Sequence, residues 1–138
     1  MNDKVFLDTA FILALTSPAD QYYEKAKQLS RQIRKEGILL VTTRAVLIEI
    51  GDAMAERRSR CAGIAAMIAL EEDEGLKIIP NSKELYNRAF NLYQSRIDKE
   101  WGMTDCISFV AMGDEGITEA LTTDTHFQQA GFVALMRE

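Results

Sequence analysis

Hydrophobic residues along the chain form short continuous runs that alternate with longer segments of helical period. Residues 4–9, KVFLDT, contain three consecutive apolar side chains, and residues 38–43, ILLVTT, have the same character. Unbroken apolar runs are typical of strands that are covered on both faces of a sheet. Further short runs lie at residues 76–80, 119–124 and 132–136, and we expect these to form the third, fourth and fifth strands.

The segments between these strands carry helix signals. Residues 20–35 place apolar side chains at helical spacing and are followed by Gly37, a common helix terminator. Strands that alternate with helices imply right-handed crossovers and a parallel sheet. The pattern therefore predicts an α/β fold, with residues 1–138 as one domain. The other expected helices span residues 43–60, residues 63–74 with Gly75 as the stop, residues from the N-cap Ser82 to about 97, and residues 104–112.

Composition places the chain among soluble globular proteins and excludes several kinds of site. Hydrophobic residues make up 47% and charged residues 27% of 138 residues, which is enough for a hydrophobic core. No apolar run approaches the ~20 residues of a membrane span, and the N-terminus lacks the pattern of a signal peptide. We therefore expect a cytoplasmic protein. Cys61, Cys106 and a single histidine are too few ligands for a structural zinc site.

The net charge limits what the chain can bind. A formal net charge of −5 argues against a protein that coats nucleic acid, although the distribution of charge matters more than its total. The first half of the chain concentrates basic residues, and a solvated helix face or a phosphate-binding surface would both explain them. These basic residues are Arg31, Arg34, Lys35, Arg44, Arg57, Arg58 and Arg60.

Four acidic residues stand at positions where a parallel sheet places its ligands. Asp8 closes the first predicted strand and Asp124 closes the fourth. Asp105 begins the helix that leads into the fourth strand, and Glu49 lies among apolar residues in the helix after the second. Open parallel sheets bind ligands just beyond the carboxyl ends of their strands. We expect these four side chains to converge at that edge.

Each acid also has a simpler interpretation. Asp8 and Asp124 would serve as N-caps of following helices, and Asp105 would favour the positive end of its own helix. Glu49 would be a solvated side chain, and Asp52, one turn further on, competes with it for the inward position. Taken together, the four acids favour a shared role over four separate ones.

A divalent cation explains why several carboxylates would share one pocket. Converging carboxylates repel one another, which raises their pKa values, and a bound cation removes that penalty. An oxygen-rich site without soft ligands suits Mg²⁺ or Mn²⁺. We therefore expect a metal ion to be the missing partner of Asp105, which stands in the apolar stretch WGMTDCISF without a basic neighbour.

At these residues the sequence resembles the PIN-domain family, and especially the VapC-type ribonuclease toxins of toxin–antitoxin pairs. FLDTAFILAL is similar to the family's opening strand with its first acid, and TTRAVLIEIGDAM to the segment with the second. MTDCISFVAM resembles the third motif, and LTTDTHFQQAGF the closing motif, in which Thr123 or Thr125 would assist the acid. The four motifs occur in the family's order over nearly the whole chain.

The resemblance implies a fold and an activity. The expected fold is a PIN-like three-layer α/β/α sandwich around a parallel sheet in the order 3-2-1-4-5. The expected activity is that of a Mg²⁺- or Mn²⁺-dependent endoribonuclease that hydrolyses RNA phosphodiester bonds with metal-activated water. An RNA substrate, a homodimer and an antitoxin protein are the partners it suggests.

Specific roles follow for individual residues. Asp8, Glu49 and Asp105 would hold one metal ion, and Asp124 would complete that site or help to bind a second. The hydroxyl groups of Thr9, Thr104 and Ser108 would either fix carboxylates and waters by hydrogen bonds or cap their helices. Arg44 is the first choice for a phosphate contact because it opens the helix that carries Glu49. We expect His126 to make a local hydrogen bond and leave it out of the catalytic set.

Other classes of protein explain the sequence less well. A phosphatase with a nucleophilic aspartate would carry a second aspartate two residues after Asp8, where Ala10 stands. A receiver domain would carry paired acids there, and no nucleotide-binding glycine motif occurs. The main alternative is a catalytically silent PIN-like module that binds a partner protein.

Overall fold

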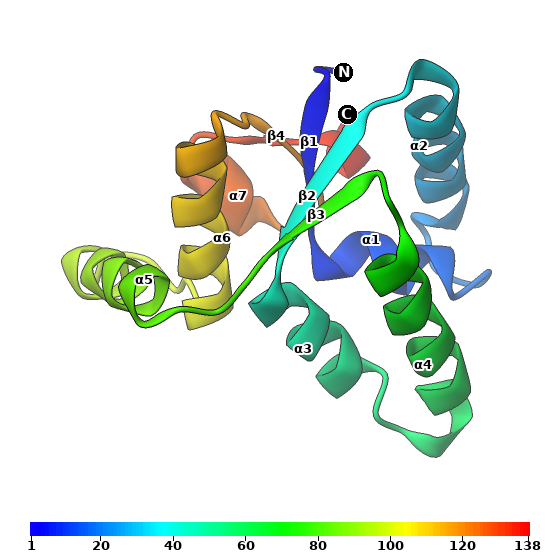
Figure 1. Ribbon diagram of the computed structural model, residues 1–138, viewed down its shortest axis with the longest axis horizontal. Helices are drawn as coiled ribbons and strands as arrows, with labels where there is room; N and C mark the ends of the chain where they lie inside the picture. Colours follow the sequence, from blue (N-terminus) through cyan, green and yellow to red (C-terminus); the bar gives the residue numbers. More distant parts are fainter.

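The computed structural model describes residues 1–138 and contains a five-stranded sheet in which every pair of neighbouring strands is parallel (Figure 1). The strand order β3-β2-β1-β4-β5 confirms the predicted fold class and topology. The strands are β1 (Lys4–Leu7), β2 (Leu39–Thr43), β3 (Leu76–Ile79), β4 (Glu119–Leu121) and β5 (Val133–Ala134).

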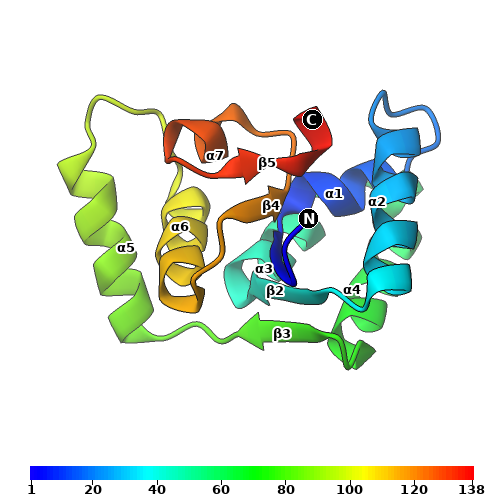
Figure 2. The same ribbon diagram turned by 90° about the horizontal axis from the view of Figure 1, so that it is seen from above.

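Helices cover both faces of this sheet and make a three-layer sandwich. The helices are α1 (Thr9–Leu15), α2 (Tyr23–Glu36), α3 (Arg44–Ala53), α4 (Arg57–Glu72), α5 (Lys83–Ser95), α6 (Met103–Glu115) and α7 (Thr125–Gln129). Figure 2 shows α5 and α6 on one side of the sheet and α1 and α2 on the other. None of these helices combines the length and the apolar character that crossing a membrane requires.

Several helix ends lie where the sequence signals place them. Gly37 ends α2 with a positive φ of 64°, a conformation that glycine adopts without the penalty other residues meet. The hydroxyl group of Ser82 accepts a hydrogen bond from the backbone N–H of Leu85 at 3.0 Å, which confirms the predicted N-cap of α5. Thr43 caps α3 in the same way through the N–H of Val46.

The boundary between α3 and α4 differs from the prediction. The sequence places one helix over residues 43–60 and the next over 63–74, whereas the structure breaks the chain between Ala53 and Arg57. Gly63, the predicted first residue of the second helix, lies inside α4. A β-carbon on Gly63 would come within 2.9 Å of the β-carbon of Met54, so the glycine allows the two helices to pack closely where the chain turns.

The first and last strands are shorter than predicted. β1 ends at Leu7 and the chain enters α1 at Thr9, so the last two residues of the predicted strand lie outside it. Similarly, β4 ends at Leu121, and the run predicted as a strand over 132–136 gives two strand residues followed by the 3-10 helix Leu135–Arg137.

Sheet register and aromatic packing fix the edge where the predicted site lies. Leu7 of β1 pairs with Leu121 of β4, which brings the next residues, Asp8 and Thr122, side by side at the carboxyl ends of these strands. On one side of the sheet, Phe109 of α6 packs edge-on against Phe127 of α7, with ring centroids 5.0 Å apart. Trp101 packs edge-on against Phe109 and is only 6% exposed, so it belongs to the core.

Candidate active site

Four separate elements bring the four predicted acids to one edge of the sheet. Asp8 follows β1, and Asp124 lies between β4 and α7. Glu49 projects from α3, and Asp105 lies in the first turn of α6. The carboxylates are close enough for Asp8 to feel the charges of Glu49 and Asp105, and for Glu49 to feel those of Asp105 and Asp124. The structure therefore brings together all four acids that the sequence selects.

Burial distinguishes these acids from ordinary surface carboxylates. Asp8 is 6% exposed, although it carries no pairing Lys or Arg. Glu49, Asp105 and Asp124 are half-buried. Asp52, the competitor of Glu49 on α3, is exposed, although residues three apart lie on the same side of a helix. The structure thus assigns the inward position on α3 to Glu49.

Burial also changes the acidity of the cluster. Desolvation raises the pKa of the Asp8 carboxyl from 3.8 to about 7, and repulsion from Glu49 and Asp105 adds to this effect. Desolvation likewise raises the pKa of Glu49 and of Asp105, again with a contribution from neighbouring carboxylates. The raised pKa values mean that the charged carboxylates are disfavoured when no cation is near. A cation bound between them would stabilise their charged form.

Hydroxyl groups hold two of the carboxylates in place. Thr9 donates to Oε1 of Glu49, as expected for a residue that fixes a carboxylate. Thr122, which is fully buried, donates to Oδ2 of Asp8 at 2.7 Å and accepts the backbone N–H of Asp124 at 3.0 Å. Sequence reasoning missed Thr122, since it named Thr123 and Thr125 in the same motif. The strand register, which pairs Leu7 with Leu121, is what selects Thr122.

The other two predicted hydroxyl groups are placed differently. Ser108 donates to the backbone carbonyl of Thr104 at 3.0 Å, one turn earlier in α6, so its hydroxyl group contacts no carboxylate. The side chain of Thr104 makes no hydrogen bond within the protein. Both residues therefore lie beside Asp105 on α6 without holding it.

The simpler N-cap interpretation holds for one acid of the two. Asp124 accepts the backbone N–H of His126 at 2.8 Å and so caps α7. Asp8 occupies the corresponding position before α1 but makes no side-chain capping hydrogen bond. Capping therefore does not account for the burial of Asp8.

His126 is the second residue that sequence reasoning left out of the site. Its Nδ1 lies 3.0 Å from Oδ2 of Asp105 and 3.4 Å from Oδ1 of Asp124. The backbone N–H of His126 makes the expected local hydrogen bond, to Asp124, whereas the hydrogen bond of the ring to Asp105 spans 21 positions of the sequence. Only the packing of α6 against α7 brings these two residues together.

The donor set of the site consists mainly of carboxylate oxygens that remain available. Glu49, Asp105 and Asp124 each use one oxygen as a hydrogen-bond acceptor from the protein and keep the second without a protein donor. Ligand atoms of Asp105, Asp124 and His126 lie within 4.8 Å of one another, a tighter group that does not include Asp8 or Glu49. Free carboxylate oxygens are the ligands that Mg²⁺ and Mn²⁺ prefer, so the residues present fit such an ion.

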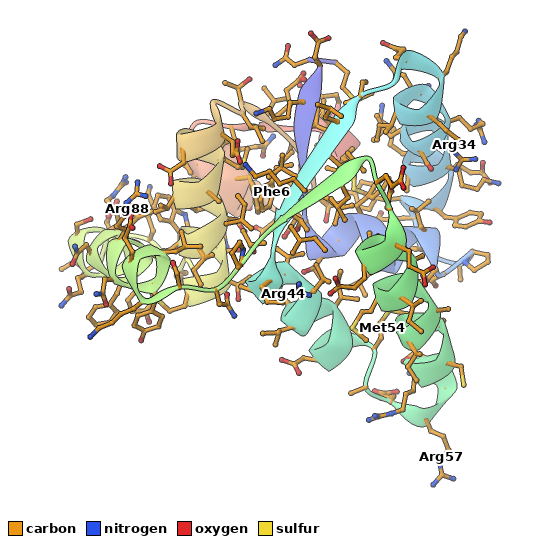
Figure 3. All side chains as sticks on the ribbon, in the orientation of Figure 1. Phe6, Arg34, Arg44, Met54, Arg57 and Arg88 are labelled. Carbon is orange, nitrogen blue, oxygen red and sulfur yellow. The ribbon has the colours of Figure 1, made fainter.

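The basic residues that cluster in the sequence do not gather on one surface. Arg34, Arg44 and Arg57 lie on three different helices, with Arg34 and Arg57 far apart in Figure 3. Arg44 opens α3 as predicted, and its guanidinium group pairs with Glu71 of α4. Of this group, Arg44 is the one that shares a helix with Glu49.

Comparison with known proteins identifies a family and structures of similar fold. A family model described as PIN domain matches residues 5–133, a range that includes all four acids. The fold is similar to the crystal structure of VapC20 from Mycobacterium tuberculosis, a sarcin-ricin loop cleaving toxin, with a TM-score of 0.84 and 25% sequence identity. This similarity covers 94% of the present chain and 97% of that one. The comparison with curated proteins gave no match.

Proposed function

Since this chain belongs to the PIN-domain family and is of the VapC type, we propose that it is a divalent-metal-dependent endoribonuclease. The observation that carries the proposal is the convergence of four carboxylates at one edge of the sheet, without a lysine or arginine to neutralise them. Such a cluster raises the free energy of the metal-free protein, and it is explained by a cation that the cluster binds.

The metal would be held by carboxylates that the fold has already oriented. Asp8, Glu49 and Asp105 would hold one Mg²⁺ or Mn²⁺, and Asp124 would complete that site or help to bind a second ion. Thr122 and Thr9 keep Asp8 and Glu49 in fixed rotamers by hydrogen bonds, so little side-chain entropy is lost when the ion binds. When bound, such an ion lowers the pKa of water and neutralises charge on the phosphate oxygens of the RNA.

Arg44 is the proposed contact to the RNA backbone. It begins the helix that carries Glu49, so a phosphate near the metal would lie within the reach of that helix terminus. Because Arg44 already pairs with Glu71, a phosphate would exchange with that carboxylate instead of meeting a free guanidinium group. The net gain in affinity is then smaller than for an unpaired arginine, while the salt dependence remains.

The decisive experiment is cleavage of RNA by the wild type and by Asp8→Asn and Asp105→Asn. An RNA hairpin of the sarcin-ricin type is the first substrate to test, because the related VapC20 cleaves that loop. Total cellular RNA and single-stranded DNA test the breadth of the activity. We expect cleavage by the wild type with Mg²⁺ or Mn²⁺, no cleavage with EDTA, and loss of activity in both variants.

Asp114→Asn serves as the matched control. Asp114 lies on the same helix as Asp105, but it is exposed and pairs with Arg88 at 2.7 Å, away from the cluster. Wild-type rates in Asp8→Asn or Asp105→Asn would remove the proposed mechanism. Absence of both cleavage and metal-induced thermal stabilisation in the wild type would favour the silent interaction module instead.

The proposal extends to the partners and location that the family implies. We propose that residues 1–138 act as one PIN-like domain in the cytoplasm, as a homodimer, and that an antitoxin protein restrains the activity. The mass of the purified protein by light scattering tests the dimer against the 15.5 kDa chain. A small protein encoded in the neighbouring reading frame, co-purified with the chain, would test the antitoxin.

A further inference from the structure

His126 occupies a position from which it contacts two of the four acids. The ring Nδ1 lies 3.0 Å from Oδ2 of Asp105, and the backbone N–H of the same residue donates to Oδ1 of Asp124 at 2.8 Å. Asp105 and Asp124 come from the start of α6 and the start of α7, two elements with no sequence continuity. A single residue thus connects two carboxylates that the fold must hold in register.

The contacts are distributed unevenly over the carboxylate oxygens. Oδ2 of Asp105 accepts both Nδ1 of His126 and the backbone N–H of Gly102, at 3.0 Å and 3.1 Å. Oδ1 of Asp124 accepts the backbone N–H of His126. In both residues the donors from the protein therefore occupy one oxygen and leave the other, Oδ1 of Asp105 and Oδ2 of Asp124, without a protein donor.

We propose that His126 is a positioning residue for the metal-binding carboxylates. With hydrogen on Nδ1, the ring donates to Asp105 and fixes the rotation of that carboxylate, while the backbone N–H of His126 fixes Asp124. The remaining oxygens of both acids are thereby directed to the cation. This inference rests on the proposed metal-dependent nuclease function and adds a residue to it.

The packing of α6 and α7 does not depend on the imidazole ring. Phe109 and Phe127 stack edge-on at 5.0 Å, and the Trp101 indole N–H donates to Gln129 of α7 at 3.0 Å. The side chain of His126 is 28% exposed and lies at the edge of this core. Its removal should therefore disturb the carboxylates more than the fold.

Three substitutions separate the hydrogen bond from other effects of the ring. His126→Asn keeps an N–H near the place of Nδ1, His126→Gln moves the amide out to the place of Nε2, and His126→Ala removes both. The readout is the Kd for Mn²⁺, from the electron paramagnetic resonance signal of free Mn²⁺. We expect His126→Ala and His126→Gln to weaken Mn²⁺ binding about 10- to 100-fold, and His126→Asn to stay close to the wild type.

A second readout uses the nuclease reaction itself. Because His126 would act through Asp105 and not through the RNA, kcat at limiting Mn²⁺ should fall in His126→Ala while KM for RNA stays unchanged. Excess Mn²⁺ should restore much of the lost kcat. A cooperative melting transition in EDTA shows that a variant is folded. If one variant does not fold, the comparison of Mn²⁺ affinity uses the other two.

Two results would overturn the inference. Equal Mn²⁺ affinity in the wild type and in all folded variants would show that the ring does not position the carboxylates. The second result is strong ¹⁴N coupling to Mn²⁺ in pulsed electron paramagnetic resonance spectra of the wild type, together with loss of Mn²⁺ affinity in His126→Asn. It would make His126 a direct ligand instead. The structure allows this arrangement, because ligand atoms of His126, Asp105 and Asp124 lie within 4.8 Å of one another.

Failure of the inference is distinguishable from failure of the proposed function. Mn²⁺ binding that is lost in Asp8→Asn but unchanged in His126→Ala removes only the role of His126. A wild type that binds no Mn²⁺, with Asp8→Asn indistinguishable from it, removes the metal-dependent function and this inference together.

Discussion

Replacing Asp8 by asparagine should make the metal-free protein more stable while abolishing metal binding. Burial raises the pKa of the Asp8 carboxyl from 3.8 to about 7, so the folded protein at pH 8 contains a charge that it disfavours. At about 1.4 kcal/mol for each pKa unit, the difference corresponds to about 4 kcal/mol of unfolding free energy. Asparagine has nearly the same shape, carries no charge, and can still accept the hydrogen bond from Thr122.

The pH dependence follows from the direction of this change. A folded-state pKa above the unfolded value means that the folded protein holds its proton more tightly. The stabilising effect of that proton is fully present below pH 4 and is lost as the pH rises towards 7. The difference between Asp8→Asn and the wild type should therefore be about 4 kcal/mol at pH 8, about 1.7 kcal/mol at pH 5, and close to zero at pH 3.

The assay is urea unfolding in EDTA, followed by far-UV circular dichroism and by the fluorescence of Trp101. Asp114→Asn is the control, because Arg88 lowers the pKa of that carboxyl and its neutralisation should not stabilise the protein. Added Mn²⁺ should reverse the order, since it stabilises only the form that binds it. A metal-free Asp8→Asn protein that is no more stable than the wild type at pH 8 would refute this reasoning.

Two further substitutions test the surroundings of the cluster. Thr122→Val removes the hydrogen-bond donor to Asp8 and the acceptor of the Asp124 N–H. We therefore expect the free energy of unfolding, measured with urea in EDTA, to fall by about 1–3 kcal/mol. An unchanged urea midpoint would contradict these two hydrogen bonds. Arg44→Ala should lower the salt dependence of RNA binding, measured by fluorescence anisotropy in EDTA, by about 0.7 in the slope of log K against log salt, the value for one phosphate contact to a single strand. Arg57 begins α4, at the opposite end of that helix from Glu71, the partner of Arg44 (Figure 3). Arg57→Ala should therefore leave the slope unchanged.

Much of the architecture follows from local pattern. Unbroken apolar runs such as Val5–Leu7 identify strands covered on both faces, and Gly37 and Ser82 mark helix ends through backbone conformation and capping that act over a few residues. The predicted boundary between α3 and α4 was wrong, because the second helix begins at Arg57 and not at Gly63. The local pattern does not show that Gly63 packs closely against Met54, a contact that only the fold creates.

In the candidate site, too, some residues can be recognised from local sequence and others only from the fold. An acid that lacks a basic partner in its own segment can be recognised in the sequence, and Asp8, Glu49, Asp105 and Asp124 are four such residues. Thr122 and His126 could not be recognised, because their partners are set by the register of β1 with β4 and by the contact of α6 with α7. Both contacts connect residues that are distant in the chain.

The sequence by itself determined most of the strands and longer helices, their order, and which carboxylates would have to find a partner elsewhere, because propensity, capping and burial act over one or two turns. The tertiary structure alone decided that Glu49 faces inward in place of Asp52, that Thr122 holds Asp8, and that His126 joins Asp105 to Asp124. A hydrogen bond requires two atoms within about 3 Å, and for groups 21 or 114 positions apart only the packed fold sets that distance.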